Sequence, residues 1–305
     1  MTIKKLVFVI CRSLLVIGIS YVILYPLVVK LSVSLMSAAD LKDPMVKWFA
    51  KSPTFTNFSH ATEVMEYGKA FLNTFILTVI VTLLQVLSCT LAAYGYARLK
   101  FKFSGILFAL TIFTLVVPPS TYMISSYMQF RFFDPLGIVT LIKGDSGILN
   151  SYLPFVLKAV TASGIRCGLY IYIMRQFFRG LPKELEEASM IDGAGTVKTF
   201  FSVILPNSKT SLMTIAMFSF VWQWNDDYFT SLLAPDMKFL TTGLGNLQNE
   251  LFLAAGGGAT QLDPLQVSSW LNAGALITII PIILLFVISQ KYFVQGMEHS
   301  GITGI

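Results

Sequence analysis

The sequence predicts an all-α membrane protein with about six transmembrane helices and one cytoplasmic helix-turn-helix loop. Of its 305 residues, 55% are hydrophobic and only 12% are charged, whereas about a quarter of the residues in a soluble domain are charged. About six stretches reach the roughly twenty apolar residues that a helix needs to cross a bilayer. A densely charged polar segment, residues 181–206, lies between two of these stretches and holds four of the 16 acidic residues.

The first apolar stretch runs from Leu6 to Val29, within residues 1–30, and is too long for the apolar region of a signal peptide. Arg12 lies close enough to the charged end of this stretch for its side chain to reach the interface. Residues 31–69 are polar and are expected to form an ordered extracellular segment. The second stretch, Phe71 to Ala97, contains no charged residue.

The turn after the second stretch carries Arg98, Lys100 and Lys102 before the next apolar run begins at Phe103. Short loops that are rich in Lys and Arg remain in the cytoplasm. This turn is therefore predicted to be cytoplasmic. The excess of Lys and Arg on the same side of the predicted topology places both termini in the cytoplasm as well.

The third stretch continues from Phe103 to Phe130 but contains Pro118 and Pro119. Neither proline can continue an ordinary helix without the loss of a backbone hydrogen bond. A simple helix end near Val117 and a functional kink are both compatible with this pattern. In lipid, the backbone groups released by a kink must be satisfied by protein neighbours or by a water-filled cavity.

The fourth stretch, about Tyr152 to Phe178, contains two cations, Lys158 and Arg166. On one continuous helix, residues eight positions apart lie within about 80° of each other. Lys158 is expected to snorkel to the outer interface. Arg166 lies too deep for this, so it either faces a cavity or another subunit or has a structural role, since buried cations need such partners.

The last two stretches run from Ser211 to Trp224 and from about Val267 to Gln290. The chain is therefore interpreted as one membrane domain, residues 1–305, whose core spans occupy roughly residues 70–295. Three cysteines fall in apolar segments and only two histidines are present, without the spacing of metal ligands. No metal site is predicted, and the net charge of +6 suits membrane lipid without requiring nucleic acid.

Two short helices are predicted in residues 181–206. The first, Lys183 to Ile191, follows a proline and carries acids that complement the helix dipole at its N-terminus. The second begins at Val197 and should stop before Pro206. Its apolar positions have the spacing of one helix face, which is expected to lie along the membrane surface: Val197, Phe200, Phe201, Ile204 and Leu205.

Gly193 and Gly195 allow a sharp turn between the two helices. The first helix has apolar and acidic groups on several sides, a pattern typical of a helix that inserts into a groove of a partner protein. The segment is therefore predicted to be a cytoplasmic docking element, with an undocked, solvated loop as the alternative.

The same residues resemble the signature loop of the membrane subunits of ATP-binding-cassette importers. Glu187-Ala188-Ser189, Gly193 and then Val203-Ile204-Leu205-Pro206 follow the family spacing and depart from it only by Ser for Ala and Val for Ile. The resemblance extends over nearly the whole chain. Four further segments are similar to the carbohydrate-importer branch, which includes the maltose-type second permease: residues 93–98, 175–182, 224–226 and 292–296.

The resemblance implies an assembly in the bacterial cytoplasmic membrane. It consists of this chain, a homologous second permease, two cytoplasmic ATPases that bind ATP and Mg, and an extracellular solute-binding protein. This chain would bind no cofactor itself and would not be an enzyme. In such permeases the signature glutamate pairs with a basic group of the ATPase. The residues assigned to coupling by this resemblance are Glu187, Ala188, Ser189, Asp192, Gly193, Leu205 and Pro206.

Other classes of protein fit the sequence less well. The chain has no Gly-x-x-x-x-Gly-Lys-Ser/Thr phosphate loop, so energy from ATP must come from a partner. A secondary transporter or channel acting alone is the alternative from another class, but the spans from Leu6 to Trp224 contain no carboxylate for ion coupling. A permease for a non-sugar substrate would differ only in what it carries. Polar residues that could line a sugar pathway, in addition to Arg166, are Tyr122, Gln129, Asn225 and Asn272.

Overall fold

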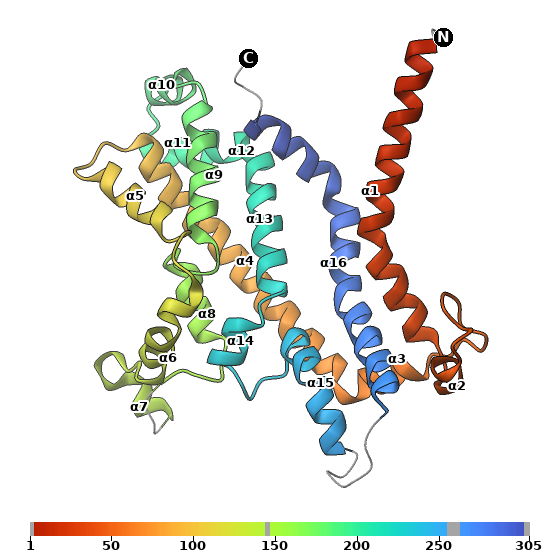
Figure 1. Cartoon of the computed structure of the whole chain (residues 1–305). Helices are drawn as coiled ribbons and strands as arrows, with labels where there is room; N and C mark the ends of the chain where they lie inside the picture. Colours follow the sequence, from red (N-terminus) through yellow and green to blue (C-terminus); the bar gives the residue numbers. More distant parts are fainter. Residues whose placement is uncertain (1–2, 144–146, 255–262, 302–305) are drawn as a thin grey trace. The chain divides into compact units, whose positions relative to one another are not determined.

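A computed structural model describes residues 3–143, 147–254 and 263–301. Every regular element in these ranges is a helix (Figure 1). The chain packs as two compact units, residues 1–70 with 243–283 and residues 71–242 with 284–305. The predicted all-α fold is confirmed.

The first unit contains the most lipid-compatible helix of the chain. Its elements are α1 (Ile3–Leu35), α2 (Ala38–Lys42), α3 (Thr56–Val64), the start of α4 (Tyr67–Arg98), the end of α15 (Leu240–Ala254) and the first part of α16 (Pro264–Gly301). Along the apolar length of α1, Val7–Leu35, almost every side chain is uncovered by protein; the exception is Ser34, which is buried near the end of the helix. An uncovered apolar helix of this length suits a hydrocarbon environment, so the first predicted span is confirmed and extends to Leu35.

The polar segment between α1 and α4 is held by a small set of buried side chains. Ser37 caps α2, and the Asp40 carboxylate accepts hydrogen bonds from the backbone N–H groups of Ser37 and Ser52. The buried Asn57 amide donates to the carbonyls of Ser34 and Met36 at 2.9 and 2.8 Å. These bonds satisfy carbonyls in and just after the last turn of α1, so the segment is ordered as the sequence predicts.

The second unit is built around α4 and a series of shorter helices. They are α5 (Ser104–Phe113), η1 (Pro119–Tyr122), α6 (Met123–Arg131), η2 (Pro135–Gly137), α7 (Ile138–Lys143), α8 (Leu153–Val160), α9 (Cys167–Gly180), α10 (Glu184–Ile191), α11 (Thr196–Thr199), η3 (Phe200–Ile204), α12 (Leu205–Asn207), α13 (Lys209–Trp224) and α14 (Tyr228–Leu233).

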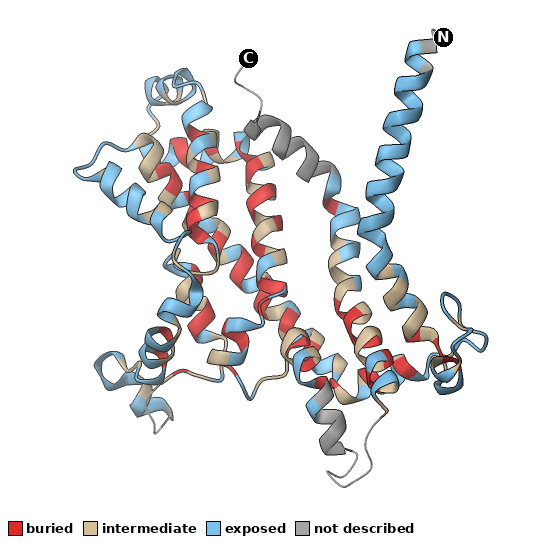
Figure 2. Ribbon diagram, viewed as in Figure 1, coloured by how far each residue is buried: buried red, intermediate tan, exposed pale blue. Residues whose placement is uncertain are grey.

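Two apolar clusters form the interior of the second unit, and α4 contributes to both (Figure 2). One cluster joins Tyr94 of α4 to Tyr170 and Phe178 of α9 and to Phe200 of η3. The other joins Leu77 of α4 to Phe155 of α8 and to aromatic residues around α14. α4 is therefore packed against protein both near its C-terminal end, at Tyr94, and nearer its start, at Leu77.

The third and fourth predicted spans are each broken into two helices. In the third, α5 ends at Phe113 and the chain resumes as η1 at Pro119, because Pro118 and Pro119 lack the N–H groups that would continue α5. In the fourth, residues 161–166 separate α8 from α9, with Ala162 and Arg166 at positive φ values of 51° and 57°. Lys158 and Arg166 therefore lie on separate segments, and the prediction of one shared helix was wrong.

The fifth and sixth predicted spans are confirmed as helices, in α13 and within α16. Among the described residues, three helices are long and apolar enough to cross a bilayer without interruption: Val7–Leu35, Tyr67–Arg98 and Pro264–Gln290. The other spans are composed of shorter pieces. Interrupted helices at membrane depth are tolerated where the freed backbone groups are buried in protein or line a cavity.

The docking segment contains the predicted first helix but differs in its second half. α10 begins at Glu184 and ends at Ile191, as predicted from Lys183 to Ile191. The second half does not stop before Pro206: η3 is a turn of π-helix, and α12 continues to Asn207. The wider π turn accommodates the proline ring, which would clash with a carbonyl of an ordinary helix.

The expected apolar face of this second half is divided between interior and surface. Phe200 and Ile204 are buried in the core, at 4% and 0% exposure, whereas Val197 and Phe201 are 72% and 51% exposed. The prediction that all five apolar positions lie on lipid was therefore wrong. One edge of this face therefore packs into the core of the second unit, and the other edge lies at its surface.

Candidate functional site

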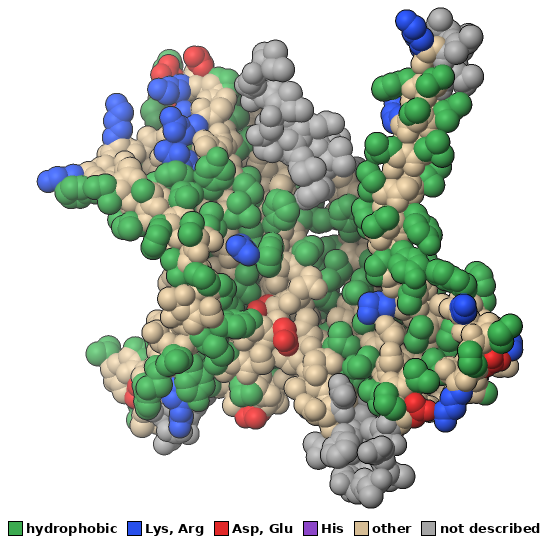
Figure 3. Space-filling model, in the orientation of Figure 1, with side chains coloured by type: hydrophobic (Ala, Val, Ile, Leu, Met, Phe, Trp, Pro, Cys, Tyr) green, Lys and Arg blue, Asp and Glu red, His purple; other side chains and the backbone are tan. Residues whose placement is uncertain are grey.

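α10 is the most exposed helix of the predicted docking segment. None of its residues is buried, and its first turn carries Glu184, Glu186 and Glu187. Three signature residues, Glu187, Ala188 and Asp192, are exposed. Figure 3 shows acidic and basic side chains gathered at the end of the second unit where α10 lies. An exposed acidic helix of this kind offers charge and shape to a partner protein.

Gly193 ends α10 in a defined way. Its φ of 81° lies in the left-handed region. The N–H of Gly193 donates to the carbonyl of Met190, and the N–H of Ala194 donates to the carbonyl of Ser189, both at 3.0 Å. This is the Schellman arrangement, in which a glycine at positive φ satisfies the last carbonyls of a helix. The signature glycine is therefore required by backbone geometry.

The contacts that fix α10 to the second unit are few. The Glu186 carboxylate forms an ion pair with Arg98 at the end of α4, with 2.9 Å between Oε1 and Nε, and the side chains are 13% and 7% exposed. Arg98 Nη2 also donates to the Leu181 carbonyl at 2.8 Å. The Ser189 and Thr199 hydroxyls lie 3.0 Å apart and join α10 to α11. Glu186 thus makes an internal contact, whereas the neighbouring Glu187 is exposed.

The last two signature residues, Leu205 and Pro206, lie in α12. Leu205 is half-buried against the core, and Pro206 is exposed. Side chains of the two residues that follow bond to carbonyls of the preceding π turn. Asn207 Nδ2 donates to the Val203 carbonyl at 2.7 Å, and Ser208 Oγ donates to the Ile204 carbonyl at 2.6 Å. This end of the segment is therefore anchored in the second unit.

A second candidate region lies at the breaks between α5 and η1 and between α8 and α9. A cavity of about 610 Å³ opens there between the two breaks, and Tyr96, Thr111, Tyr122, Ser163 and Arg166 contribute polar groups to its lining. A cavity of this size is in the range that holds a small molecule. The Arg166 guanidinium is stacked 4.5 Å from the ring of Trp222.

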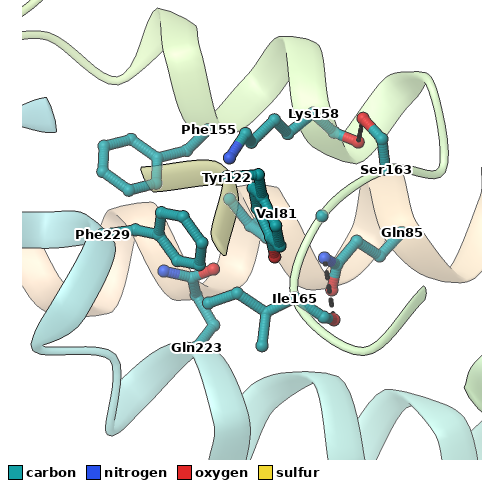
Figure 4. Close-up of a pocket in the computed structure, with 10 residues that line it drawn as sticks. Val81, Gln85, Tyr122, Phe155, Lys158, Ser163, Ile165, Gln223 and Phe229 are labelled. Carbon is teal, nitrogen blue, oxygen red and sulfur yellow. Dashed lines mark hydrogen bonds between the residues drawn. The ribbon is translucent and has the colours of Figure 1, made fainter. Parts of the chain in front are cut away.

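Lys158 lies beside this cavity among aromatic rings. Its Nζ is 4.1 Å from the centre of the Phe229 ring, 5.7 Å from that of Tyr122 and 5.9 Å from that of Phe130. Figure 4 shows the amine directed toward the ring of Phe229. Aromatic faces attract a cation electrostatically, which lowers the cost of burying it. The expectation that Lys158 snorkels to the outer interface was wrong.

Polar side chains of α4 and α13 satisfy the backbone at the second break. Gln85 Nε2 donates to the Ile165 carbonyl at 3.5 Å, and the buried Ser219 hydroxyl donates to Gln85 Oε1 at 2.6 Å. A Cβ at Gly164 would lie 2.2 Å from Gln85 Nε2, so only glycine permits this approach. Gln223 and Asp226 are also buried, at 4% and 8% exposure.

The structure brings together three of the five residues predicted for the pathway. Arg166 and Tyr122 line the large cavity, and Tyr122 also lines a neighbouring cavity with Gln129. Asn225 is not among the residues that line these cavities, and its side-chain amide donates to the Val221 carbonyl of its own helix. Asn272 belongs to the first unit, where its Oδ1 accepts from Lys30 Nζ at 3.2 Å.

Sequence reasoning did not assign a role to Gln85, Gln223 or Asp226. Gln85 carried a usable signal, because it is the most polar residue in the middle of an uncharged span, and polar residues at such depth have a specific partner. Asp226 follows α13 directly and could be placed only once the packing of α14 was known. Among the described residues, no group of three His, Cys, Asp or Glu side chains is arranged to hold a metal ion.

Comparison with known protein families identifies the chain. Residues 85–299 match the family of binding-protein-dependent transport system inner membrane components. The chain belongs to this family. It is a permease, the membrane component of an ATP-binding-cassette importer, and in this family ATP hydrolysis takes place on partner subunits.

Individual relatives cover nearly the whole permease. It is 31% identical over 287 residues to the melibiose/raffinose/stachyose import permease protein MelC of Bacillus subtilis, covering 92% of this chain and 91% of the relative. It is 27% identical over 304 residues to the sulfoquinovosyl glycerol transport system permease protein SmoH of Agrobacterium fabrum, covering 99% and 94%. The sn-glycerol-3-phosphate permease UgpE of Yersinia pestis is 24% identical over 296 residues, covering 95% of both chains.

A solved structure shares the fold of the permease. A chain of the bacterial ABC transporter that imports the acidic polysaccharide alginate matches with a TM-score of 0.71 and 19% sequence identity, covering 96% of this chain and 99% of that chain. The all-α membrane fold predicted from the signature loop and the apolar stretches is therefore confirmed.

Proposed function

We propose that the permease forms one half of the pathway by which a carbohydrate, most simply an oligosaccharide, crosses the bacterial cytoplasmic membrane. Support comes from relatives whose names specify melibiose, raffinose, stachyose and sulfoquinovosyl glycerol as their substrates. The other half of the pathway is a homologous second permease. An extracellular solute-binding protein delivers the substrate, and two cytoplasmic ATPases, which bind ATP and Mg, drive the cycle.

In this proposal α10 docks into a groove of an ATPase subunit. The observation that carries it is the contrast between two adjacent glutamates: Glu186 is engaged internally by Arg98, while Glu187 is exposed on a helix with no buried residue. An exposed carboxylate on such a helix can form a charge-assisted bond with a basic group of the partner. Asp192 and Ala188 extend the docking surface, and Gly193 sets the direction of the chain beyond it.

Docking at α10 can drive transport only if the ATPase binds α10 with different affinity in its open and closed states. A binding partner shifts a conformational equilibrium of the permease only by the difference in its affinity for the two conformations. Closure of the ATPases then turns the pathway outward. The pathway runs past the broken helices, where Arg166, Tyr122 and Gln129 lie near one another. Discontinuous helices at a substrate site are a recurring feature of transporters, because their freed backbone groups can face a cavity.

The coupling role of α10 is tested in vesicles that contain the complete transporter. Glu187→Ala and Gly193→Asp should leave membrane insertion intact but separate ATP hydrolysis from uptake. Lys198→Ala, which removes an exposed charge from the same segment outside the signature, is the matched control and should behave as the unaltered protein. Normal transport by both signature variants would overturn the assignment.

The substrate is tested by binding and uptake. The solute-binding protein that co-purifies with the permease should bind neutral oligosaccharides, and deletion of the permease should abolish their uptake. Binding of an inorganic ion or a peptide in place of a sugar would favour a non-sugar importer. Recovery of an active permease without any ATPase would instead favour a carrier acting alone.

The orientation is tested separately. With α10 in the cytoplasm, both chain ends are expected on the cytoplasmic side, in agreement with the basic turn at Arg98 to Lys102. A reporter enzyme fused after Ile305 should be active only if it works in the cytoplasm. Activity of a reporter that functions only outside the cytoplasm would reverse the topology.

A further inference from the structure

We infer that α4 is the rigid element that carries movement of α10 to the break between α8 and α9, with Arg98 at its C-terminal end and Gln85 near its middle as positioning residues. The inference rests on the proposed docking of α10 to an ATPase. According to this inference, residues of α4, which lie outside the signature loop, take part in the coupling between ATP hydrolysis and transport.

The first joint is the Arg98–Glu186 ion pair. Both side chains are withdrawn from water, with 7% and 13% exposure and 2.9 Å between Nε and Oε1. Arg98 is also bonded to the Leu181 carbonyl at 2.8 Å, so one guanidinium holds the end of α9 and the first turn of α10. Loss of either charge would leave the other unpaired in a poorly hydrated place, which is strongly unfavourable. Displacement of α10 is therefore expected to move the end of α4 with it.

The second half of the docking segment is tied to the same stretch of α4. The rings of Tyr94 and Phe200 have centroids 4.8 Å apart, and Tyr94 also meets Phe178 of α9 edge-on at 5.7 Å. Arg175 Nε donates to the Tyr96 carbonyl at 3.4 Å. The last turns of α4 are thus packed against α9, α10 and η3 together. Close-packed contacts of this kind transmit displacement because interiors are not compressible.

The helix between the two joints is uninterrupted. α4 runs from Tyr67 to Arg98 without proline, and its glycines, Gly68 and Gly95, lie near its ends. The thirteen residue steps from Gln85 to Arg98 span about 20 Å at the rise of an α-helix. Between these two residues there is no proline and no π turn, and the one glycine, Gly95, lies close to Arg98. Over most of this length α4 therefore lacks the usual causes of a helix kink.

The second joint lies at the break between α8 and α9. Ser88 Oγ donates to the Ala159 carbonyl at 2.6 Å, and Gln85 Nε2 donates to the Ile165 carbonyl at 3.5 Å. The Ala159 carbonyl belongs to the last turn of α8 and the Ile165 carbonyl to the break itself, so α4 is bonded to the chain before and after residues 161–164. Figure 4 draws a smaller neighbouring pocket, which Gln85 lines, and shows the Gln85 amide pointing at the Ile165 carbonyl. Because Ile165 lines the large cavity and its carbonyl is bonded to Gln85, a shift of α4 is expected to move backbone at the cavity.

The first test measures coupling in the complete transporter with its own solute-binding protein and substrate. Arg98→Gln and Glu186→Gln should each raise the ATP hydrolysed per substrate transported about 5-fold or more, the lower end of ordinary coupling between sites. The exchanged pair Arg98→Glu with Glu186→Arg should recover much of the coupling. Lys100→Gln, which removes an exposed cation two residues beyond Arg98, is the matched control. Unchanged coupling in both single variants would overturn the inference.

The second test does not require a known substrate. Spin labels are attached to cysteines introduced at Ile191 on α10 and Leu87 on α4, which are 85% and 52% exposed. The background carries Cys11→Ser, because Cys11 is exposed and would also be labelled, whereas the other two cysteines are buried. The distance between the labels should stay narrow and unchanged between nucleotide-free and vanadate-trapped transporter. In Glu186→Gln the distribution should broaden or shift on trapping. The same narrow distance in that variant would contradict a joint at Arg98.

The second joint is tested by a double-mutant cycle. Gln85→Leu keeps the approximate size of the side chain and removes its hydrogen bonds, and Leu83→Ala on the exposed side of α4 is its control. If Gln85 and Glu186 act in series, the effects of Gln85→Leu and Glu186→Gln on coupling should be markedly less than additive. Additive effects would show two independent routes and would overturn a role for α4 as the connecting element.

The outcomes separate this inference from the proposed function. If Glu187→Ala uncouples transport while Glu186→Gln, Arg98→Gln and Gln85→Leu do not, α10 docks as proposed but α4 does not carry its movement. If Glu187→Ala is also without effect, the proposed docking itself is wrong. Thermal unfolding of each purified variant shows whether lost coupling reflects a lost fold.

Discussion

α4 and the α8–α9 pair cover comparable lengths of chain in opposite ways. α4 is one helix of 32 residues, whereas the pair is a helix of 8 residues and a helix of 14 residues separated by residues 161–166. The interior of α4 has no proline and buries apolar side chains in both cores. The break contains Ser163-Gly164 and two residues at positive φ, and it borders the large cavity. The continuous helix, α4, is therefore the one that packs in both cores, and the interrupted pair, α8 and α9, borders the candidate pathway.

The comparison also explains where polar groups lie. Side chains of α4, Gln85 and Ser88, bond to carbonyls of the break and of the last turn of α8. The broken segment therefore depends on the continuous one for the satisfaction of its backbone. A change that interrupts α4 should harm both regions, whereas a change within the break should act mainly on the cavity.

The largest effect is expected from interrupting α4. Val86→Pro would remove a backbone hydrogen bond and force a kink, at a cost of about 3 kcal/mol or more. Thermal unfolding of the detergent-solubilised protein should show a large loss of stability or no folded protein. Val86→Ala, which keeps the backbone, is the control. A stable Val86→Pro variant would mean that α4 does not need to be continuous.

A smaller loss is expected where α9 approaches α5. A Cβ at Gly168 would lie 2.8 Å from both the Thr111 carbonyl and the Thr114 hydroxyl, so Gly168→Ala should cost about 1–3 kcal/mol through overpacking. Gly180→Ala, at the other end of α9, meets open space and is the matched control. Equal unfolding temperatures for the two variants would show that the contact between α5 and α9 adjusts easily.

The aromatic surroundings of Lys158 should contribute less. Lys158→Met would remove the cation–π contacts and leave the buried Asp226 without its nearby cation; the expected loss of stability is about 1–2 kcal/mol. Adding Asp226→Asn should recover part of this loss, because the unbalanced carboxylate is then removed. Chemical unfolding of the single and double variants tests the coupling, and purely additive losses would disprove it.

The smallest effect on stability concerns the end of α10. Gly193→Ala places a side chain at a φ of 81° and should cost about 1 kcal/mol. Gly195→Ala, where φ is −71° and a Cβ meets open space, should be close to neutral. Limited proteolysis of the segment compares the two variants. Greater cleavage in Gly195→Ala than in Gly193→Ala would contradict the role of the left-handed glycine.

The sequence predicted the helices that have a strong local signal. Apolar length identified α1, α4 and α16, and the acids after Pro182 identified α10, because both signals depend only on neighbouring residues. The residues assigned to docking by resemblance lie on one short segment, with Glu187 and Asp192 exposed. Their role in coupling remains a prediction.

The pathway residues were predicted less well because they depend on contacts between distant segments. Tyr122 and Arg166 do line one cavity, but Asn225 bonds to its own helix and Asn272 lies in the other unit. Lys158 and Arg166 were placed on one helix because hydropathy does not reveal the break at residues 161–166. That break is stabilised by Gln85, about eighty residues earlier in the chain.

The amino-acid sequence by itself therefore determined the class of protein, its lipid-compatible lengths and the signature loop that identifies its family. Only the tertiary structure decided which of two adjacent glutamates is exposed, because the ion pair between Glu186 and Arg98 joins residues 88 positions apart. The same holds for the interrupted helices and the cavity between them. Local sequence fixes which backbone conformations are available, but burial and partners from distant segments select among them.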